Sequence, residues 1–244
     1  MSIDRTTVQA TILAVGIAAG GLLAGNGLVR AKAADRYVSV KGVSEREVRA
    51  DLAIWPLHLV GADNDLAAAN GKLTKSVADV RAFLVRHGID TSQIQMADFS
   101  ATDALASESA SDRKPNNRYV VHQTVLVRST HPEQVLAASQ QVGELAAIGV
   151  VISSGTSGYV AGGPTFVFSG LNQLKPAMIA DATAHAREAA AQFARDSHSD
   201  LGGIREANQG VFEILPRDQA PGIDEPSQIA KLVRVVATID YYLR

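Results

Sequence analysis

The chain has 244 residues, of which 46% are hydrophobic and 20% are charged, a composition typical of a folded protein rather than a disordered one. It contains no cysteine, which excludes disulfides, thiolate catalysis, cysteine-ligated zinc and an N-terminal lipidated cysteine. The net charge is −2 overall and −4 beyond residue 33, where 20 basic residues stand against 24 acidic ones, so the composition disfavours nucleic-acid binding.

Residues 1–33 predict a signal peptide or an N-terminal membrane anchor. Residues 8–29 carry no charge, and a soluble domain rarely begins with such a segment. Ala31, Lys32 and Ala33 form the small-x-small pattern that signal peptidase reads, which favours cleavage, whereas the length of the uncharged run favours retention as an anchor. Two small-xxx-small pairs would permit close helix packing in a membrane: Gly16 with Gly20, and Gly21 with Gly25.

With either alternative, we expect the rest of the chain, residues 34–244, to lie in the periplasm, free after cleavage or anchored to the inner membrane. An anchored chain that faces the cytoplasm instead is the minor alternative. We expect these residues to form a single domain. Residues 38–43 and 48–60 have the composition of strands, and the polar residues 44–47 between them predict a hairpin turn. The apolar positions of the second strand change parity at Pro56, which indicates a bulge or an edge.

A helix is predicted over residues 63–87, where apolar side chains recur at steps of three and four. Asp63 or Asn64 could cap its start, and Gly88 could end its last turn. Residues 94–100 and 118–128 predict two strands. The polar residues 101–117 between them predict a mobile loop, because they have too little apolar content to pack.

A second helix is expected to begin at a capping box formed by Thr130 and Glu133 and to end before Gly149. Short strands over residues 150–153 and 165–169 would flank a glycine-rich segment, residues 155–163. A third helix, residues 172–197, carries small and apolar residues along one side: Leu174, Met178, Ala182, Ala186, Ala189 and Phe193.

The last two predicted strands, residues 203–215 and 229–243, are separated by a proline-rich segment, residues 216–228, which predicts a second mobile loop. In the last strand, alternate residues from Val233 to Leu243 are apolar, which predicts one buried face. Paired strands without strict alternation of strand and helix indicate the α+β class, with a largely antiparallel sheet and about three helices on one face.

The sequence resembles the SIMPL-domain family. Residues 38–53, Val-Ser-Val-Lys-Gly-Val-Ser-Glu-Arg-Glu-Val-Arg-Ala-Asp-Leu-Ala, are similar to its opening hairpin, although Ala50 stands where the family often has proline. Residues 181–191 and Leu201-Gly-Gly203 resemble its alanine-rich helix and the start of the strand that follows. The resemblance spans residues 37–244 and implies a periplasmic or outer-membrane-associated protein, linked to oxidative-stress defence or recognised as an immunogen, with homo-oligomeric assembly. It does not imply any enzymatic activity.

No motif in the chain predicts a catalytic, metal or cofactor site. The histidines are scattered without the spacing of a ligand pair: His58, His87, His122, His131, His185 and His198. Residues 153–158 lack the spacing of a nucleophile elbow, and residues 158–164 lack a phosphate-binding lysine. Asp51 is notable because a carboxylate in an apolar strand requires a partner, which predicts a structural hydrogen bond or salt bridge, with Arg187 as a candidate partner.

Three functions follow as alternatives. The first is a non-enzymatic envelope protein that assembles into a homo-oligomer through strand edges or the alanine-rich helix, in the setting of envelope stress defence. The second is a periplasmic small-molecule binding module with a groove beside the glycine-rich segment. The third, a hydrolase or redox enzyme with an unfamiliar site, is disfavoured by the lack of cysteine, metal pattern or nucleophile motif.

Overall fold

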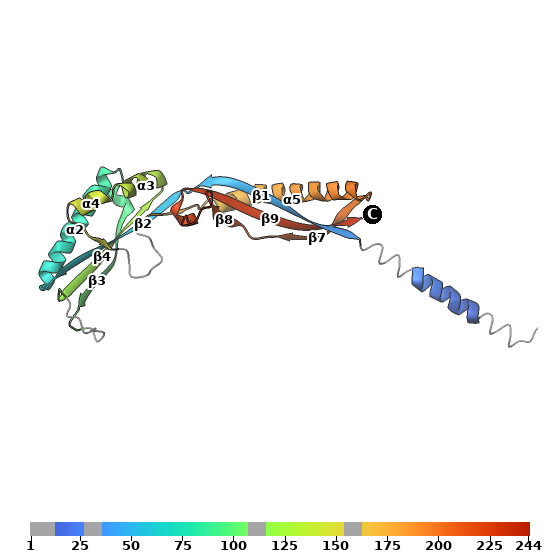
Figure 1. The fold of residues 1–244 in the computed structure, drawn as a ribbon, viewed down its shortest axis with the longest axis horizontal. Coiled ribbons are helices and arrows are strands. Elements are labelled where there is room, and N and C mark those ends of the chain that lie inside the picture. The colour runs from blue at the N-terminus through green and yellow to red at the C-terminus, as the bar shows by residue number, and fades with distance from the viewer. Residues whose placement is uncertain (1–12, 27–35, 107–115, 154–162) are drawn as a thin grey trace, which may run out of the picture. The chain divides into compact units, whose positions relative to one another are not determined.

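A computed structural model of the protein describes residues 13–26, 36–106, 116–153 and 163–244. The chain divides into two compact units: unit 1 takes residues 1–45, 176–212 and 234–244, and unit 2 takes residues 46–175 and 213–233. Each unit has an antiparallel sheet with helix on one face (Figure 1). The predicted α+β class is therefore confirmed, with the strands divided between two sheets instead of gathered in one.

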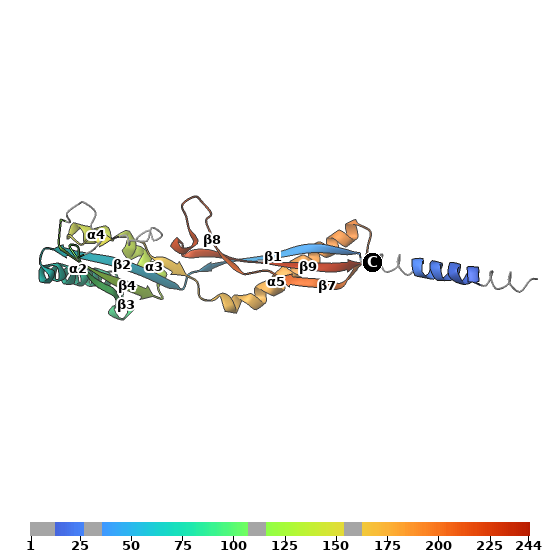
Figure 2. The same ribbon diagram turned by 90° about the horizontal axis from the view of Figure 1, so that it is seen from below.

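The sheet of unit 1 has the order β1-β9-β7. These strands are β1 (Tyr37–Arg49), β9 (Ala230–Leu243) and β7 (Leu201–Gln209), and Figure 2 shows them in this order. Alternate residues of β9 are buried, as the sequence predicts: Val233, Val235, Ala237, Ile239, Tyr241 and Leu243. The helix α5 (Leu171–Asp196) covers this face of the sheet (Figure 1).

The buried stripe of α5 is Met178, Ala182, Ala186, Ala190 and Ala194. The predicted stripe is confirmed from Met178 to Ala186; Leu174 before it is half-buried, and beyond it the prediction is wrong, because Ala189 is exposed and Phe193 is 49% exposed. Steps of four residues advance about 40° around a helix with 3.6 residues per turn, so the buried line winds around α5. A twisted sheet presents a rotating surface of this kind to the helix that packs on it.

Gly42 explains how closely β1 and α5 approach. A Cβ atom at this position would lie 1.8 Å from the carbonyl oxygen of Ala182 and 2.5 Å from the amide nitrogen of Ala186. Only glycine fits, because both neighbouring atoms belong to the main chain. Ala182 and Ala186 of α5 are thus buried within unit 1, against β1. That the exposed side of this alanine-rich helix contacts a second subunit stays a prediction.

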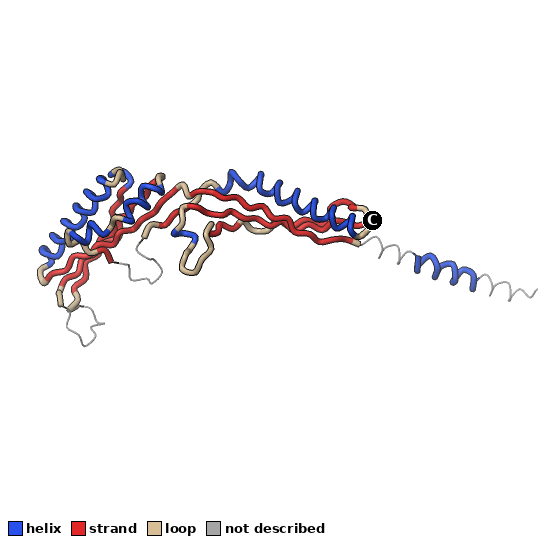
Figure 3. Tube along the Cα trace, turned by 45° about the horizontal axis from the view of Figure 1, so that its top comes forward, coloured by secondary structure: helices blue, strands red, loops and turns tan. Residues whose placement is uncertain are grey.

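Unit 2 contains the sheet β3-β4-β2-β5, with β6 also paired to β2. Its strands are β2 (Leu52–Asp63), β3 (Ile94–Asp103), β4 (Tyr119–Ser129), β5 (Ile152–Ser153) and β6 (Thr165–Val167); β8 (Glu213–Pro216) also belongs to unit 2 and pairs with β9. The helices α2 (Leu66–Arg86), α3 (Pro132–Gln140) and α4 (Gly143–Ala147) cover one face (Figure 3). Trp55, Phe83 and Phe166 are among the largest side chains of its core.

The predicted hairpin between residues 38–43 and 48–60 is wrong. β1 continues without interruption through residues 44–47 and pairs with β9, whereas β2 pairs with β4. Ser44 is buried, while Glu45 and Glu47 are exposed. The two glutamates therefore lie on the solvated face of a strand and Ser44 on its buried face, because side chains of a strand alternate between the two faces of its sheet.

A bulge or an edge was predicted at Pro56. No bulge is present in the pairing of β2 with β4, which is continuous from Ala53 to Asp63. The change of parity falls at Ala50 and Asp51, between the two strands. Among the described pairs on the other side of β2, β6 faces residues 52–54 and β5 faces residues 58–59. Pro56, which has no amide hydrogen, lies between these two partners.

The helix ends agree with the sequence only in part. Asp65, one residue beyond the two candidates, caps α2 by accepting a hydrogen bond of 2.8 Å from the amide of Ala68. Gly88 has a φ of 82°, as expected for a residue that ends a helix. The predicted capping box does not form: His131 is the N-cap of α3 and makes no side-chain capping bond. The second predicted helix is divided into α3 and α4.

Several predicted segments lie partly outside the described residues: positions 107–115 of the loop 101–117, positions 155–162 of the glycine-rich segment, and positions 1–12 and 27–33 of the N-terminal segment. Residues 13–26 are helical and include Gly16, Gly20, Gly21 and Gly25. Within the described ranges, no helix has the length and apolar character needed to cross a membrane. The segment 216–228 contains a short 3-10 helix, η2 (Glu225–Ser227); another, η1 (Thr91–Gln93), precedes β3.

Candidate assembly edge and polar groove

β1 lies at one end of the strand order in unit 1, so one of its edges has no neighbouring strand among the described residues. The amide of Leu243 donates to the carbonyl of Arg36 across 2.8 Å, which directs the main-chain groups of even-numbered residues toward β9. In an antiparallel ladder, alternate residues direct both main-chain groups to the same side. The amides and carbonyls of Tyr37, Ser39, Lys41, Val43 and Glu45 therefore face the free edge.

This edge of β1 has no bulge between Arg36 and Glu45. The main-chain hydrogen bonds from Leu243 to Arg36 and from Ala50 to Ile229 bracket this stretch, and residues 36 and 50 are as far apart in sequence as residues 229 and 243. Equal spacing on both strands means that no extra residue is inserted. The edge of β1 thus presents a regular row of donors and acceptors to solvent.

The other long edge strands differ from β1 in this respect. β3 has a register shift between Ala97 and Ser100, with Asp98 at a φ of 52°, and β7 has register shifts between Leu201 and Glu206. Bulges twist an edge away from further pairing, which is one way that proteins avoid unwanted strand addition. Of these three edges, only β1 lacks this protection.

His185 on α5 is in contact with the free edge. Its Nδ1 lies 2.7 Å from the carbonyl oxygen of Val43, and because a carbonyl only accepts, Nδ1 carries the hydrogen. One acceptor of the edge is therefore already engaged by a side chain of the same unit.

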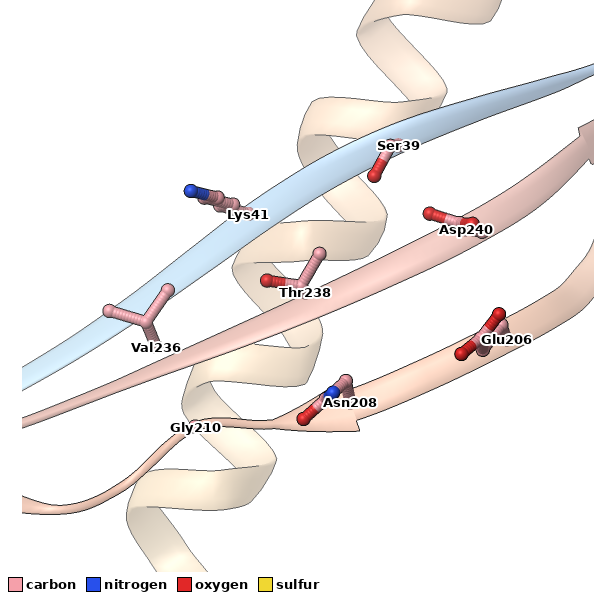
Figure 4. Close-up of a pocket in the computed structure, with 8 residues that line it drawn as sticks. All are labelled: Ser39, Lys41, Glu206, Asn208, Gly210, Val236, Thr238 and Asp240. Carbon is pink, nitrogen blue, oxygen red and sulfur yellow. The ribbon is translucent and has the colours of Figure 1, made fainter.

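A polar groove of about 440 Å³ lies on the face of this sheet that α5 leaves uncovered (Figure 4). It is lined by Ser39 and Lys41 from β1, by Val236, Thr238 and Asp240 from β9, and by Glu206, Asn208 and Gly210 at β7 and just beyond it. Glu206 is the register partner of Asp240, so two carboxylates of like charge are cross-strand neighbours. The Lys41 ammonium points away from Asp240.

The groove expected beside the glycine-rich segment lies largely outside the described residues, and the groove of unit 1 was not predicted. Its signal was present in the alternation of β9, where Thr238 and Asp240 fall on the polar face. The partner strands could not be identified, because a strand pattern does not state which strands are neighbours.

Asp51 connects the start of β2 to the segment before α5. Its carboxylate accepts hydrogen bonds from the amide of Ser169, at 2.9 and 3.2 Å, and from the Ser169 hydroxyl, at 2.8 Å. The Asp51 amide donates to the carbonyl of Val167. These contacts are structural. Arg187 is an exposed residue of α5 in unit 1, and its pairing with Asp51 stays a prediction.

Lys231 was missed by the sequence reasoning. It is fully buried in β9 and donates to the carboxylate of Glu225 and, across 2.8 Å, to the main-chain oxygen of Glu225. A buried ammonium requires such partners, because burial removes its hydration. The parity of β9 held the signal, since Lys231 shares the buried face of Val233.

The histidines have separate roles in the described structure. His58 Nδ1 lies 2.9 Å from the Thr124 hydroxyl, and His87 Nε2 lies 3.6 Å from the Glu144 carboxylate. Over the described part of the chain, no three histidine, aspartate or glutamate side chains gather in a way that could hold a metal ion.

Surface ion pairs lower the pKa of several carboxyl groups in unit 2. Hydrogen bonds from Arg118, at 2.9 and 3.1 Å, lower the pKa of Asp103, and the Arg49 guanidinium lowers the pKa of Glu133. The Lys72 ammonium, 2.7 Å from Asp63, lowers the pKa of that carboxyl. These groups lie at the surface of unit 2, which gives them the ordinary role of exposed ion pairs.

The chain matches the sequence profile of one protein family. The sequence profile of the SIMPL family, described as a protein of unknown function (DUF541), matches residues 38–237. Among the curated proteins, none matches the chain. The chain is similar at 11% identity to a solved structure, the crystal structure of an uncharacterized conserved protein from Listeria innocua; the match covers 79% of this chain and 91% of that chain, with a TM-score of 0.21.

Proposed function

The chain belongs to the SIMPL family, and from this membership and the free edge of β1 we propose that it is a non-enzymatic periplasmic protein that self-assembles into a homo-oligomer. The uncharged segment 8–29 supports export, with cleavage or anchoring to the inner membrane as its two outcomes. In this proposal the assembled protein contributes to envelope stress defence.

The free edge of β1 is the observation that carries the proposal. A row of unpaired main-chain donors and acceptors is a template for another strand, and its pairing would satisfy several hydrogen bonds at once. Because β3 and β7 are interrupted by bulges, β1 offers the regular edge for a second copy.

Particle size tests this proposal. Full-length protein, extracted with detergent or collected from the periplasm, is measured by light scattering over a range of micromolar concentrations. We expect a mass that is a multiple of the 25.7 kDa chain, or of the shorter chain that cleavage would leave. A monomer at every concentration, or recovery of the mature protein from the cytosol, would contradict the proposal.

The polar groove favours a second candidate, a binding module for a small molecule with both charges. Lys41 supplies a cation and the neighbouring Glu206 and Asp240 supply two anions, so an amino acid or short peptide would match the lining. Thermal unfolding with a panel of such compounds tests this function. We expect a rise in melting temperature that Glu206→Gln abolishes, and failure across a broad panel would count against it.

A further inference from the structure

The charges along the free edge of β1 are arranged in a self-complementary way. Lys41 and Glu45 lie on the same face of the strand, on either side of Val43 and at equal distances from it. When two copies of a strand pair antiparallel about a two-fold axis, residues equidistant from the axis face each other. An axis at Val43 therefore places Lys41 of each copy opposite Glu45 of the other.

From this pattern we infer that β1 pairs antiparallel with β1 of a second copy, with the two-fold axis at Val43. The inference rests on the proposed self-assembly and names its contact site and its register. The odd-numbered residues from Lys41 to Glu45 direct their main-chain groups to the free edge, so the pairs formed about Val43 are hydrogen-bonded pairs. Each copy contributes one lysine and one glutamate to two identical ion pairs.

Both charged groups are available for this contact. Lys41 is exposed and makes no ion pair within the described residues. The side chain of Glu45 is 48% exposed and lies 3.5 Å from Arg234, a long contact that leaves carboxylate oxygen free to accept from a second cation. Opposite charges that face each other across paired strands are stabilising, and like charges are destabilising.

The neighbouring registers are less favourable. An axis at Lys41 would place two lysines opposite each other, and an axis at Glu45 would do the same with two glutamates. An axis at Ser44 would pair Lys41 with Glu47, but it would place the Glu45 carboxylate opposite the apolar Val43. The register about Val43 is the one that pairs both charges nearest the axis.

Charge reversal in the full-length protein tests the register. Lys41→Glu and Glu45→Lys each place like charges opposite each other twice, and we expect each to weaken self-association about tenfold. An equimolar mixture of the two variants restores opposite charges in the mixed pair, as does the double variant K41E/E45K. Both the mixture and the double variant should therefore associate as the unchanged protein does. Circular dichroism verifies that each variant is folded.

Glu47→Lys is the matched control. In the register about Val43 this residue faces the neutral Ser39, so the substitution should leave association unchanged. If K41E is rescued by E47K instead of E45K, the axis lies at Ser44 and the inferred register is wrong. If all variants associate equally, β1 is not the contact, although self-assembly stands. A monomeric unchanged protein would overturn the proposed function and this inference together.

Discussion

At the scale of single residues, the Asp51 carboxylate links the start of β2 to the segment that precedes α5. It accepts three hydrogen bonds from Ser169, which lies 118 positions further along the chain. Hydrogen bonds to a charged acceptor contribute more than neutral ones, and Asp51 is only partly exposed. Asp51→Ala should therefore lower the free energy of unfolding by about 2 kcal/mol.

Urea unfolding, followed by circular dichroism, measures this loss. Asp51→Asn should lose less, because an amide oxygen can still accept from the Ser169 amide. Asp224→Ala is the control, since Asp224 is an exposed N-cap that makes no side-chain capping bond. Equal unfolding midpoints for Asp51→Ala and Asp224→Ala would show that the contacts of Asp51 add nothing to stability.

The pair formed by Asp103 and Arg118 predicts a pH effect. Its hydrogen bonds lower the pKa of Asp103 in the folded chain below the ordinary value, which the carboxyl regains on unfolding. The stabilisation is therefore complete above about pH 4 and is lost as the pH falls through the folded-state pKa. Asp103→Asn should make stability less dependent on pH in this acidic range.

Thermal melts from pH 7 down to pH 2.5 test this effect. Arg118→Gln should flatten the same part of the curve, because it removes the donor that lowers the pKa of Asp103. A curve for Asp103→Asn that runs parallel to that of the unchanged protein would contradict the assignment.

The sequence predicted which residue needs a hydrogen-bond partner better than it predicted which residue supplies that partner. Asp51 was identified because a carboxylate in an apolar stretch needs a hydrogen-bond donor. Its donor, Ser169, follows a short strand far along the chain, and local pattern carries no information on that distance. Lys231 is different: the alternation of β9 placed it on the buried face, but its burial was not predicted because the sequence shows no partner for its ammonium group.

At the scale of elements, the same substitution, glycine to alanine, should change the free energy of unfolding in opposite directions at two positions. Gly42→Ala would insert a Cβ 1.8 Å from main-chain oxygen of α5, which forces the helix away from β1. We expect a loss of about 3 kcal/mol in the free energy of unfolding, the upper part of the range for overpacking. Gly71→Ala, on the exposed face of α2 with nothing within 4 Å, should gain about 1 kcal/mol from helix propensity.

Chemical unfolding of the two variants under the same conditions measures both effects. The comparison separates steric contact from the general consequence of replacing glycine, because the added methyl group is the same. If Gly42→Ala were as stable as the unchanged chain, the close approach of β1 to α5 would be incorrect.

The errors in strand pairing have a common physical origin. Residues 44–47 are polar enough for a turn, and two strands adjacent in sequence usually form a hairpin. The residues of β1 nevertheless satisfy a different constraint, because Gly42 and Ser44 fall on the buried face and Glu45 on the solvated one. Alternation identified the strands, while the choice of partner depended on β9, near the other end of the chain.

At the scale of the whole molecule, the boundaries between the two units fall inside β1, α5 and β9. Each unit is thus completed by segments that are distant in sequence, which explains why the sequence showed no boundary between domains. Main-chain hydrogen bonds flank β1 at both ends: Arg36, just before β1, pairs with Leu243 in unit 1, and Ala50, just after β1, pairs with Ile229 in unit 2. The free edge of β1 is consequently formed by a strand that is fixed at both of its ends.

This arrangement gives His185 a role in assembly that can be measured. Its imidazole engages the Val43 carbonyl, which lies on the free edge and on the inferred axis. A second copy would offer the amide of its own Val43 to the same oxygen, so the imidazole and the incoming strand compete. His185→Ala should therefore strengthen self-association several-fold, as measured by sedimentation equilibrium. Glu188→Ala, an exposed substitution on the same helix, should leave it unchanged. Weaker association of His185→Ala than of Glu188→Ala would mean that the imidazole supports the paired edge instead of opposing it.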